Sequence, residues 1–74
     1  MKRARSSPLR RVLARNLRLR RDALGLSQEE LAELSGLHRT NVSKFERELH
    51  GMSIDNLYWL AKALKVKPAQ LLES

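Results

Sequence analysis

Apolar residues recur along this chain at the three- and four-residue spacing of amphipathic helices, and Gly, Pro or Ser separates one run from the next. The first run predicts a helix from Pro8 to about Leu24, with Ser7 as its N-cap and Gly25 ending it. One apolar strip of this helix is expected to meet the core, and a second strip lies beside it. The strip expected to meet the core consists of Leu13, Leu17 and Leu24. The second strip consists of Val12, Leu19 and Ala23.

The segment SQEELAELSGLHRTNVSKFE predicts two short helices joined by a tight turn. Ser27 is a favourable N-cap for the first of them, and Glu30 stands where it completes a capping box. Gly36 is expected to end this helix, because glycine readily adopts the left-handed conformation found at helix C-termini. The residues predicted to be core-facing are Leu31, Ala32 and Leu34.

The second of these short helices is predicted from about Arg39 to Arg47, with Val42 and Phe45 on its inward side. Its outward side consists of Arg39, Thr40, Asn41, Ser43 and Lys44. An α-helix fits the major groove of B-DNA, where each base pair presents a distinct set of donors, acceptors and methyl groups. A short helix with small and basic outward residues can enter that groove, so this pattern indicates a helix-turn-helix.

The C-terminal third of the chain predicts two further helices. Ser53 caps the first, SIDNLYWLAKAL, in which Asp55 suits the positive end of the helix dipole. Its predicted core face comprises Ile54, Leu57, Tyr58, Leu60, Ala61 and Leu64. Trp59 points to the opposite side, as an interface anchor or as an isolated surface aromatic residue. Pro68 begins a last short helix, whose Leu71 and Leu72 either close the core or join a partner.

These elements predict an all-α protein, a compact five-helix bundle that contains a helix-turn-helix. The chain of 74 residues is long enough for one domain with one small core. We place this domain at residues 8–74, after a flexible basic N-terminal arm at residues 1–7. Lys2, Arg3 and Arg5 of the arm either touch phosphates or a narrow minor groove or form a solvated tail, and charge runs of this kind favour the tail.

The charge balance indicates an anionic partner, because the formal net charge is +7 and the pI about 10.9. Charge alone does not distinguish DNA, RNA and an anionic membrane surface. Without cysteine, the chain forms no disulfide, thiolate metal site or thiol nucleophile. The apolar runs are too short to span a membrane, and no apolar segment follows the charged N-terminus as in a secretion signal. A cytoplasmic location is therefore expected.

An enzyme is not expected. The two histidines, His38 and His50, have no acidic residues beside them at metal-ligand spacing, and no Gly-rich phosphate loop or nucleophile motif occurs. No catalytic residue, metal or cofactor is predicted. A core this small leaves no room for an effector pocket, so no small-molecule effector is expected either.

The residues LGLSQEELAELSGLHRTNVSKFE resemble the helix-turn-helix of the phage Cro/repressor-like DNA-binding family, also called the XRE family. Within them, GLSQEELAELSGLHRT is particularly similar to the controller proteins of bacterial restriction–modification systems. The similarity continues through SIDNLYWLAKALKV to PAQLL, so it covers about residues 9–72. It implies the lambda repressor-like DNA-binding fold and a sequence-specific transcriptional regulator. Such a protein acts as a homodimer on a palindromic operator with half-sites about 10 bp apart.

The resemblance also assigns roles to individual residues. The positions that contact bases correspond to Arg39, Thr40, Ser43 and Lys44. The positions expected to contact phosphates correspond to Gln28, His38, Asn41, Arg47 and His50. Arg39 can donate two hydrogen bonds to guanine O6 and N7, and Gln28 can reach a phosphate together with the N-terminus of its helix. His38 replaces the small hydroxyl residue usual at this N-cap and is a poor cap.

The family pattern further implies that Arg21 and Glu46 pair, which would tie the first helix to the recognition helix. Glu48 and Lys65 stand where the family usually has glycine. The end of the recognition helix is therefore expected to run differently, and Lys65 to adopt a positive φ. Leu19 and Trp59 stand where relatives usually carry polar residues, which makes Trp59 a candidate for a partner contact. Leu19 either turns the first helix slightly or packs against a partner chain.

The possible dimer interface comprises Leu19, Trp59, Leu71 and Leu72. Among regulators, a restriction–modification controller is favoured, and a phage-type repressor or the antitoxin of a toxin–antitoxin pair is close behind. A different class also remains open. In a protein-interaction module, these same apolar residues would grip another protein and DNA binding would be incidental.

Overall fold

The chain folds into four α-helices followed by one 3-10 helix in a computed structural model that describes residues 5–74. The elements are α1 (Leu9–Ala23), α2 (Gln28–Ser35), α3 (Arg39–Glu46), α4 (Ile54–Ala63) and the 3-10 helix η1 (Pro68–Leu72). The described residues contain no strand, which confirms the all-α prediction; the fifth predicted helix is a 3-10 helix. Residues 5–7 have no regular structure, and the predictions for Lys2 and Arg3 lie outside the described residues.

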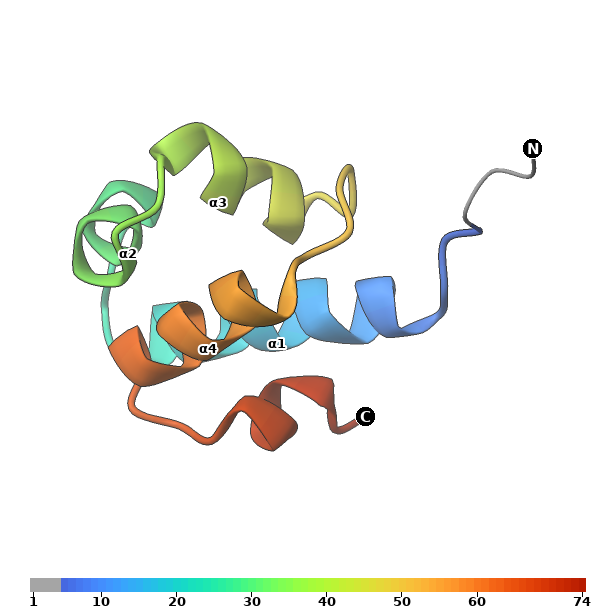
Figure 1. The fold of residues 1–74 in the computed structure, drawn as a ribbon. Coiled ribbons are helices and arrows are strands. Elements are labelled where there is room, and N and C mark those ends of the chain that lie inside the picture. The colour runs from blue at the N-terminus through green and yellow to red at the C-terminus, as the bar shows by residue number, and fades with distance from the viewer. Residues whose placement is uncertain (1–4) are drawn as a thin grey trace.

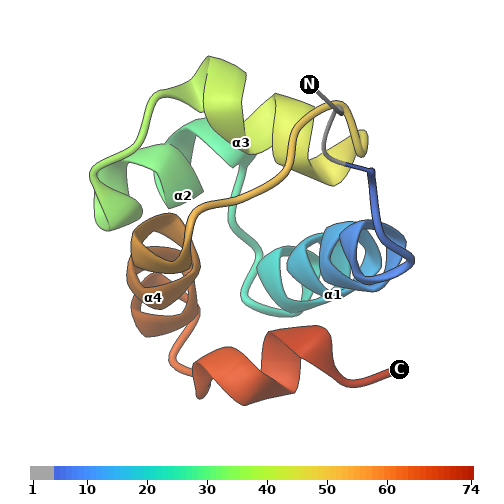
Figure 2. The same cartoon turned by 45° about the vertical axis from the view of Figure 1, so that its right-hand side comes forward.

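The helices enclose one core, and α3 forms the outermost layer on one side of it (Figure 1). The helix α1 packs against α3 and η1, while α2 packs against α3 and α4. In Figure 2, α1 and α4 lie beneath α2 and α3, and η1 lies at the bottom, on the side of the core away from α3. This arrangement leaves one long side of α3 without a covering element.

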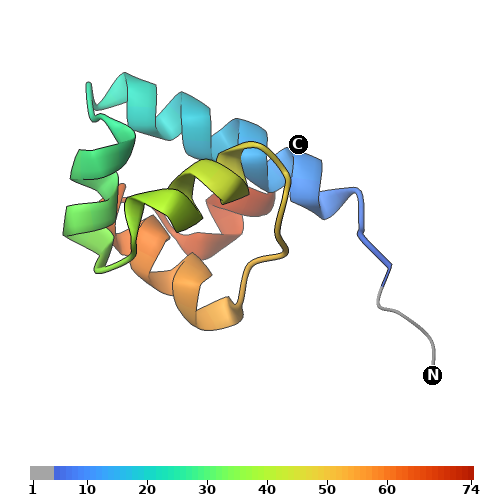
Figure 3. The ribbon, with the colours of Figure 1, turned by 90° about the horizontal axis from the view of Figure 1, so that it is seen from above.

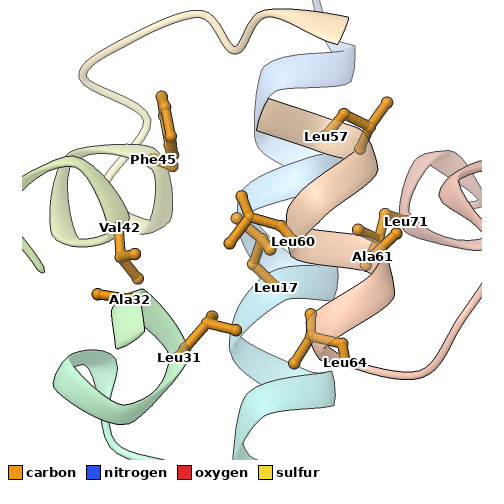
Figure 4. Packing of buried hydrophobic residues seen from close by; sticks show 10 residues of the cluster. All are labelled: Leu17, Leu31, Ala32, Val42, Phe45, Leu57, Leu60, Ala61, Leu64 and Leu71. Atoms are coloured by element: carbon orange, nitrogen blue, oxygen red, sulfur yellow. The ribbon is translucent and has the colours of Figure 1, made fainter. Parts of the chain in front are cut away.

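The core consists of apolar residues from every helix (Figure 4). Its members are Leu17, Leu31, Ala32, Val42, Phe45, Leu57, Leu60, Ala61, Leu64 and Leu71. Leu71 is fully buried, so it closes the core and the expectation that it lies in a dimer interface is wrong. The 3-10 helix η1 packs on α1. Two hydrogen bonds from the Asn16 side-chain amide, to the backbone carbonyl oxygens of Leu71 and Glu73 at 2.9 and 2.7 Å, secure that contact.

Four residues predicted to face the core are exposed instead: Leu24, Leu34, Ile54 and Tyr58. Leu24 follows the last residue of α1, where the chain already turns away towards Gly25. The other three lie at the edges of the buried faces of α2 and α4, because each short helix covers only a narrow strip of the core. Ile54 is the most exposed of them, at 78%.

The start of α1 also differs from the prediction. Pro8 occupies the N-cap position and Leu9 is the first helical residue, with no side-chain hydrogen bond from a cap. Ser7 contributes its backbone carbonyl, which accepts a hydrogen bond from the Arg10 amide at 3.0 Å. The expected role of the Ser7 hydroxyl is therefore wrong.

The other predicted caps are confirmed. The Ser27 hydroxyl accepts a hydrogen bond from the Glu30 amide at 3.0 Å, and the Glu30 carboxylate accepts one from the Ser27 amide at 2.8 Å. These two bonds form the capping box, and the bond from the Ser27 backbone is the main reason that the pKa of Glu30 lies below its usual value. Gly36 ends α2 at a φ of +79°, and Ser53 caps α4 through the Asn56 amide at 3.1 Å.

Within residues 5–74, two residues other than glycine adopt the left-handed conformation. Glu48 and Lys65 each have a φ of +61°, at the two positions where the sequence resemblance leads one to expect glycine. The side chain makes this conformation costly by about 1–2 kcal/mol, against about 0.5–1 kcal/mol for the extra flexibility of glycine in the unfolded chain. Both helix ends therefore hold strain that glycine would relieve.

We accordingly expect Lys65→Gly to raise the free energy of unfolding by about 0.5–1 kcal/mol. Urea denaturation of the variant and the parent protein measures this difference. Glu33→Gly is the matched control, because Glu33 is an exposed residue inside α2, where glycine should lower stability by about 1 kcal/mol. A loss of stability in both variants would show that Lys65 is not strained.

None of the helices in residues 5–74 combines the length and the apolar character that crossing a membrane requires.

Candidate nucleic-acid interface

The recognition helix candidate, α3, is anchored on one side and open on the other. Val42 is fully buried and Phe45 is 7% exposed, and both point into the core from α3 (Figure 4). Arg39 and Thr40 are exposed, and Ser43 and Lys44, one turn later, are half-buried. Figure 3 looks onto α3 from above and shows that no other helix lies over it. The buried side fixes the rotation of the helix, so the open side is presented as one rigid surface.

A hollow of about 200 Å³ lies on this open side. Its lining comprises Gln28, Arg39, Thr40, Ser43, Lys44 and Arg47. The structure thus brings together all four residues predicted to contact bases and two of those predicted to contact phosphates. Residues from the N-terminus of α2 and along α3 share the surface, although they lie far apart in the sequence.

The lining is electropositive. Arg39, Lys44 and Arg47 carry its charges, and it contains no carboxylate. Within residues 5–74, none of these three cations forms an ion pair. Their positive charges are therefore available to an anionic ligand, and they lie beside the hydroxyl groups of Thr40 and Ser43, which can donate or accept hydrogen bonds.

An ion pair fixes the position of α3 relative to α1. Arg21 Nε donates to Glu46 Oε2 at 2.7 Å, and Arg21 Nη2 donates to Glu46 Oε1 at 3.0 Å. The Glu46 side chain is 2% exposed and that of Arg21 15%. The hydrogen bond to Glu46 raises the pKa of Arg21 above its ordinary value. Arg21 also donates to the Leu26 carbonyl at 2.8 Å, which ties the turn between α1 and α2 to the same group.

The same carboxylate holds the side chain of Gln28. Gln28 Nε2 donates to Glu46 Oε1 at 3.1 Å. This bond uses one N–H of the amide and leaves the other N–H and the carbonyl oxygen for a ligand. The Glu30 amide, by contrast, is already bonded to Ser27. Any anion at the N-terminus of α2 would therefore meet the Gln28 side chain and the remaining amides of the first turn.

Sequence reasoning missed Arg18, whose guanidinium donates to the backbone carbonyl of Glu46. This bond satisfies a carbonyl at the C-terminal end of α3, where a positive charge also suits the helix dipole. Its signal in the sequence is its place one turn before Arg21, on the same side of α1. Six arginines in this helix obscure that signal.

Three predicted phosphate contacts lie outside the hollow. His38 is the exposed N-cap of α3 and makes no side-chain capping bond, and Asn41 is half-buried beside the open face. His50 lies in the loop before α4 and lines a separate hollow of about 330 Å³ near the start of α1. Among the described residues, no group of three or more histidine and acidic side chains is placed to hold a metal ion.

The remaining interface candidates are at the surface. Leu19 is 59% exposed on α1, Trp59 is 48% exposed on α4, and Leu72 at the end of η1 is 36% exposed. The Trp59 ring meets the Tyr58 ring edge to face, at 4.9 Å between centroids, and Lys62 Nζ lies 5.7 Å from the Trp59 ring centroid. Trp59 is thus held among its neighbours on α4.

Comparison with known proteins agrees with this geometry. The helix-turn-helix family HTH_3 matches residues 17–71. The control protein C.SmaI of Serratia marcescens is 44% identical over 64 residues, which are 86% of this chain and 76% of that protein. A hypothetical transcription factor of Neisseria meningitidis is 50% identical over 64 residues, and the aligned part spans 60% of its length.

Two solved structures have the same fold. The hypothetical transcription factor NHTF from Neisseria superposes with a TM-score of 0.84 at 50% identity, covering 86% of this chain and 72% of that one. The restriction-modification controller protein C.AhdI of Aeromonas hydrophila gives a TM-score of 0.81 at 44% identity, covering 84% of this chain and 94% of that one. The chain belongs to the HTH_3 (XRE) helix-turn-helix family of DNA-binding transcription regulators.

Proposed function

We propose that this protein is a restriction–modification controller that binds a palindromic operator as a homodimer, with one recognition helix in the major groove of each half-site. The observation that carries the proposal is the open face of α3. There, two arginines and a lysine surround two hydroxyl groups in one hollow without a carboxylate. Relatives named as control proteins, C.SmaI and C.AhdI, support the choice of controller among regulators.

In this proposal the residues of α3 in the hollow contact bases, and Gln28 of α2 contacts a phosphate. Arg39 is at the start of α3, where side chains reach deepest into the major groove, and its guanidinium can donate to O6 and N7 of one guanine. Thr40, Ser43 and Lys44 contact the neighbouring bases. Gln28 contacts a phosphate at the edge of the groove and thereby sets the register of α3, without discriminating between sequences.

The ion pair between Arg21 and Glu46 holds the DNA-contacting helices in a fixed arrangement. Because Arg21 and Gln28 both bond to Glu46, the N-terminus of α2 and the C-terminus of α3 are fixed to α1 through one carboxylate. The position of a phosphate bound by Gln28 is therefore fixed relative to the bases that α3 contacts. His38, Asn41, Arg47 and His50 remain proposed phosphate contacts around this centre.

Selection of bound duplexes from a random pool tests the proposed function. The expected product is a palindrome whose half-sites are about 10 bp apart. Recovery of no common sequence would overturn sequence-specific binding. A stable protein partner captured without DNA, together with weak DNA binding, would instead favour the interaction-module alternative. An adjacent endonuclease gene would support a controller, whereas an adjacent toxin gene would support an antitoxin.

The proposal also predicts a steep dependence of binding on salt. Each phosphate contact releases condensed counterions, so the logarithm of the binding constant should fall by about 0.9 per log unit of salt for every phosphate contacted. Fluorescence anisotropy of a labelled operator at several salt concentrations gives this slope. The slope should become smaller by about one for each cation removed from a phosphate contact, as in Arg47→Ala. A flat salt response would contradict groove binding by this basic face.

A further inference from the structure

The outer face of α4 carries an aromatic patch with a charge on either side. Asp55, Trp59 and Lys62 lie on the side of α4 opposite to its buried residues, and Tyr58 lies next to them. Tyr58 and Trp59 are each 48% exposed, although they are the largest side chains of the helix. Within residues 5–74, neither Asp55 nor Lys62 forms an ion pair. The face thus offers apolar area and two unpaired charges of opposite sign.

The charged pair and the aromatic pair are arranged symmetrically about one point along α4. The midpoint of α4 between Asp55 and Lys62 is also the midpoint between Tyr58 and Trp59. A second α4 that runs antiparallel through this midpoint sets Asp55 against the partner's Lys62, and Tyr58 against the partner's Trp59. A two-fold axis repeats both contacts, so the face is complementary to itself.

The fold places this face correctly for a dimer on DNA. In Figure 1, α4 runs across the molecule below α3, and Figure 3 shows α4 along the edge opposite α1. The outer face of α4 therefore points sideways relative to the open face of α3. A two-fold axis that runs from the body towards α3 would pair the two α4 helices antiparallel and leave both recognition helices on the same side.

Two other exposed surfaces suit a second copy less well. The hollow around Leu26 and Leu34 is lined by Glu30 and Glu33, so a two-fold contact there would bring four carboxylates together. The N-terminal half of α1 carries Arg10, Arg11 and Arg15, which would repel their counterparts in a chain of net charge +7. Among these faces, α4 combines apolar area with charges that match their own symmetry mates.

We propose that α4 is the homodimer interface, with Trp59 and Tyr58 at its centre and Asp55 paired with the partner's Lys62. This inference rests on the proposed function, because it specifies how the two recognition helices are joined. The edge-to-face contact between Tyr58 and Trp59 and the position of Lys62 near the Trp59 ring fix the aromatic side chains before association. Less side-chain freedom is then lost when the dimer forms.

Sedimentation equilibrium of the full chain without DNA tests the interface. Trp59→Ala should raise the dimer dissociation constant by about 30-fold or more, as expected for an aromatic anchor at the centre of an interface. Leu34→Ala is the control, since Leu34 is 61% exposed outside the proposed face and should leave the constant unchanged. A monomeric parent protein, an unaffected Trp59 variant, or a weakened Leu34 variant would overturn the proposal.

Charge reversal makes the test independent of the aromatic residues. Asp55→Lys and Lys62→Asp each place like charges against one another, so each variant alone should dimerise about tenfold more weakly. An equimolar mixture of the two restores both opposite-charge contacts and should form a heterodimer of nearly parental affinity. A mixture as weak as its components would contradict the antiparallel pairing. Circular dichroism melts show that each variant is folded.

Binding to DNA separates this inference from the proposed function. The Trp59→Ala variant should bind a duplex with one half-site as tightly as the parent protein does, but lose most of the additional affinity for the full palindrome. Equal losses on both duplexes would overturn the role of Trp59 in dimerisation. If the parent protein binds neither duplex, the proposed function fails, whereas the sedimentation result still decides the interface.

Discussion

Replacing Glu46 with alanine is expected to lower the free energy of unfolding by about 3–5 kcal/mol. The Glu46 side chain is 2% exposed and accepts hydrogen bonds from Arg21 and Gln28, so its removal leaves a largely buried guanidinium without its partner. Folded proteins in general are stable by only about 5–15 kcal/mol, so much of the stability would be lost. Urea denaturation followed by circular dichroism measures the change.

Asp22→Ala is the matched control for this experiment. Asp22 also lies near Arg21, with 3.3 Å between Asp22 Oδ1 and Arg21 Nη1, but its side chain is 70% exposed. Water screens such a pair, so its loss should change stability by less than about 1 kcal/mol. If both substitutions lowered the free energy of unfolding equally, burial would not be the reason that the ion pair of Glu46 stabilises the fold.

Replacing Arg39 with alanine should cost about 1–3 kcal/mol of binding free energy on the best operator and relax the preference at one base pair. Arg39 is exposed at the first position of α3 and forms no ion pair within the described residues, so its guanidinium is available for both acceptors of a guanine. The substitution should leave stability unchanged, because the side chain contributes nothing to the core. Gel-shift titrations on operators altered one base pair at a time measure the effect.

Gln28→Ala provides the contrast. Gln28 lines the same hollow, but at the N-terminus of α2, where we expect a phosphate contact. Its loss should weaken binding to every operator by a similar factor, because phosphates carry no sequence information. Arg21 continues to hold Glu46 in this variant, so the fold should persist. If Arg39→Ala also weakened all operators alike, Arg39 would be a phosphate contact.

Much of the fold could be predicted from the sequence because local signals agree with one another. Ser27 and Glu30 mark the start of α2 through hydrogen bonds between their side chains and each other's backbone amides, and Gly36 marks its end through a left-handed backbone, as expected. Lys65 could be assigned a positive φ only through the family pattern, and it adopts one. The caps of α2 are short-range features, which depend on neighbouring residues alone.

Apart from the cap assigned to Ser7, the errors concern how much of each helix surface is buried. Leu34 and Ile54 fit helical periodicity, yet they lie at the edges of the buried faces of α2 and α4 and remain at the surface. Leu71 could not be assigned to the core or to a partner, because that depends on how η1 packs on α1. The bond from Gln28 to Glu46 was likewise not predictable, since it joins two helices across eighteen residues.

The open face of α3 followed from helical spacing around Val42 and Phe45, which shows that one buried pair can fix the orientation of a short helix. The convergence of Gln28 and Arg47 on that face required the three-dimensional structure. Candidate residues near the end of α3 were harder to place. His50 lies beyond the left-handed turn at Glu48, which takes the chain towards a different hollow.

Chemical methylation of guanine N7 in the bound operator tests the central claim most directly. Because N7 lies in the major groove, a recognition helix there should protect one guanine in each half-site, and Arg39→Ala should abolish that protection while the complex persists at higher protein concentration. Bound operator whose guanines remain fully reactive, with or without Arg39, would contradict the reading of bases by α3.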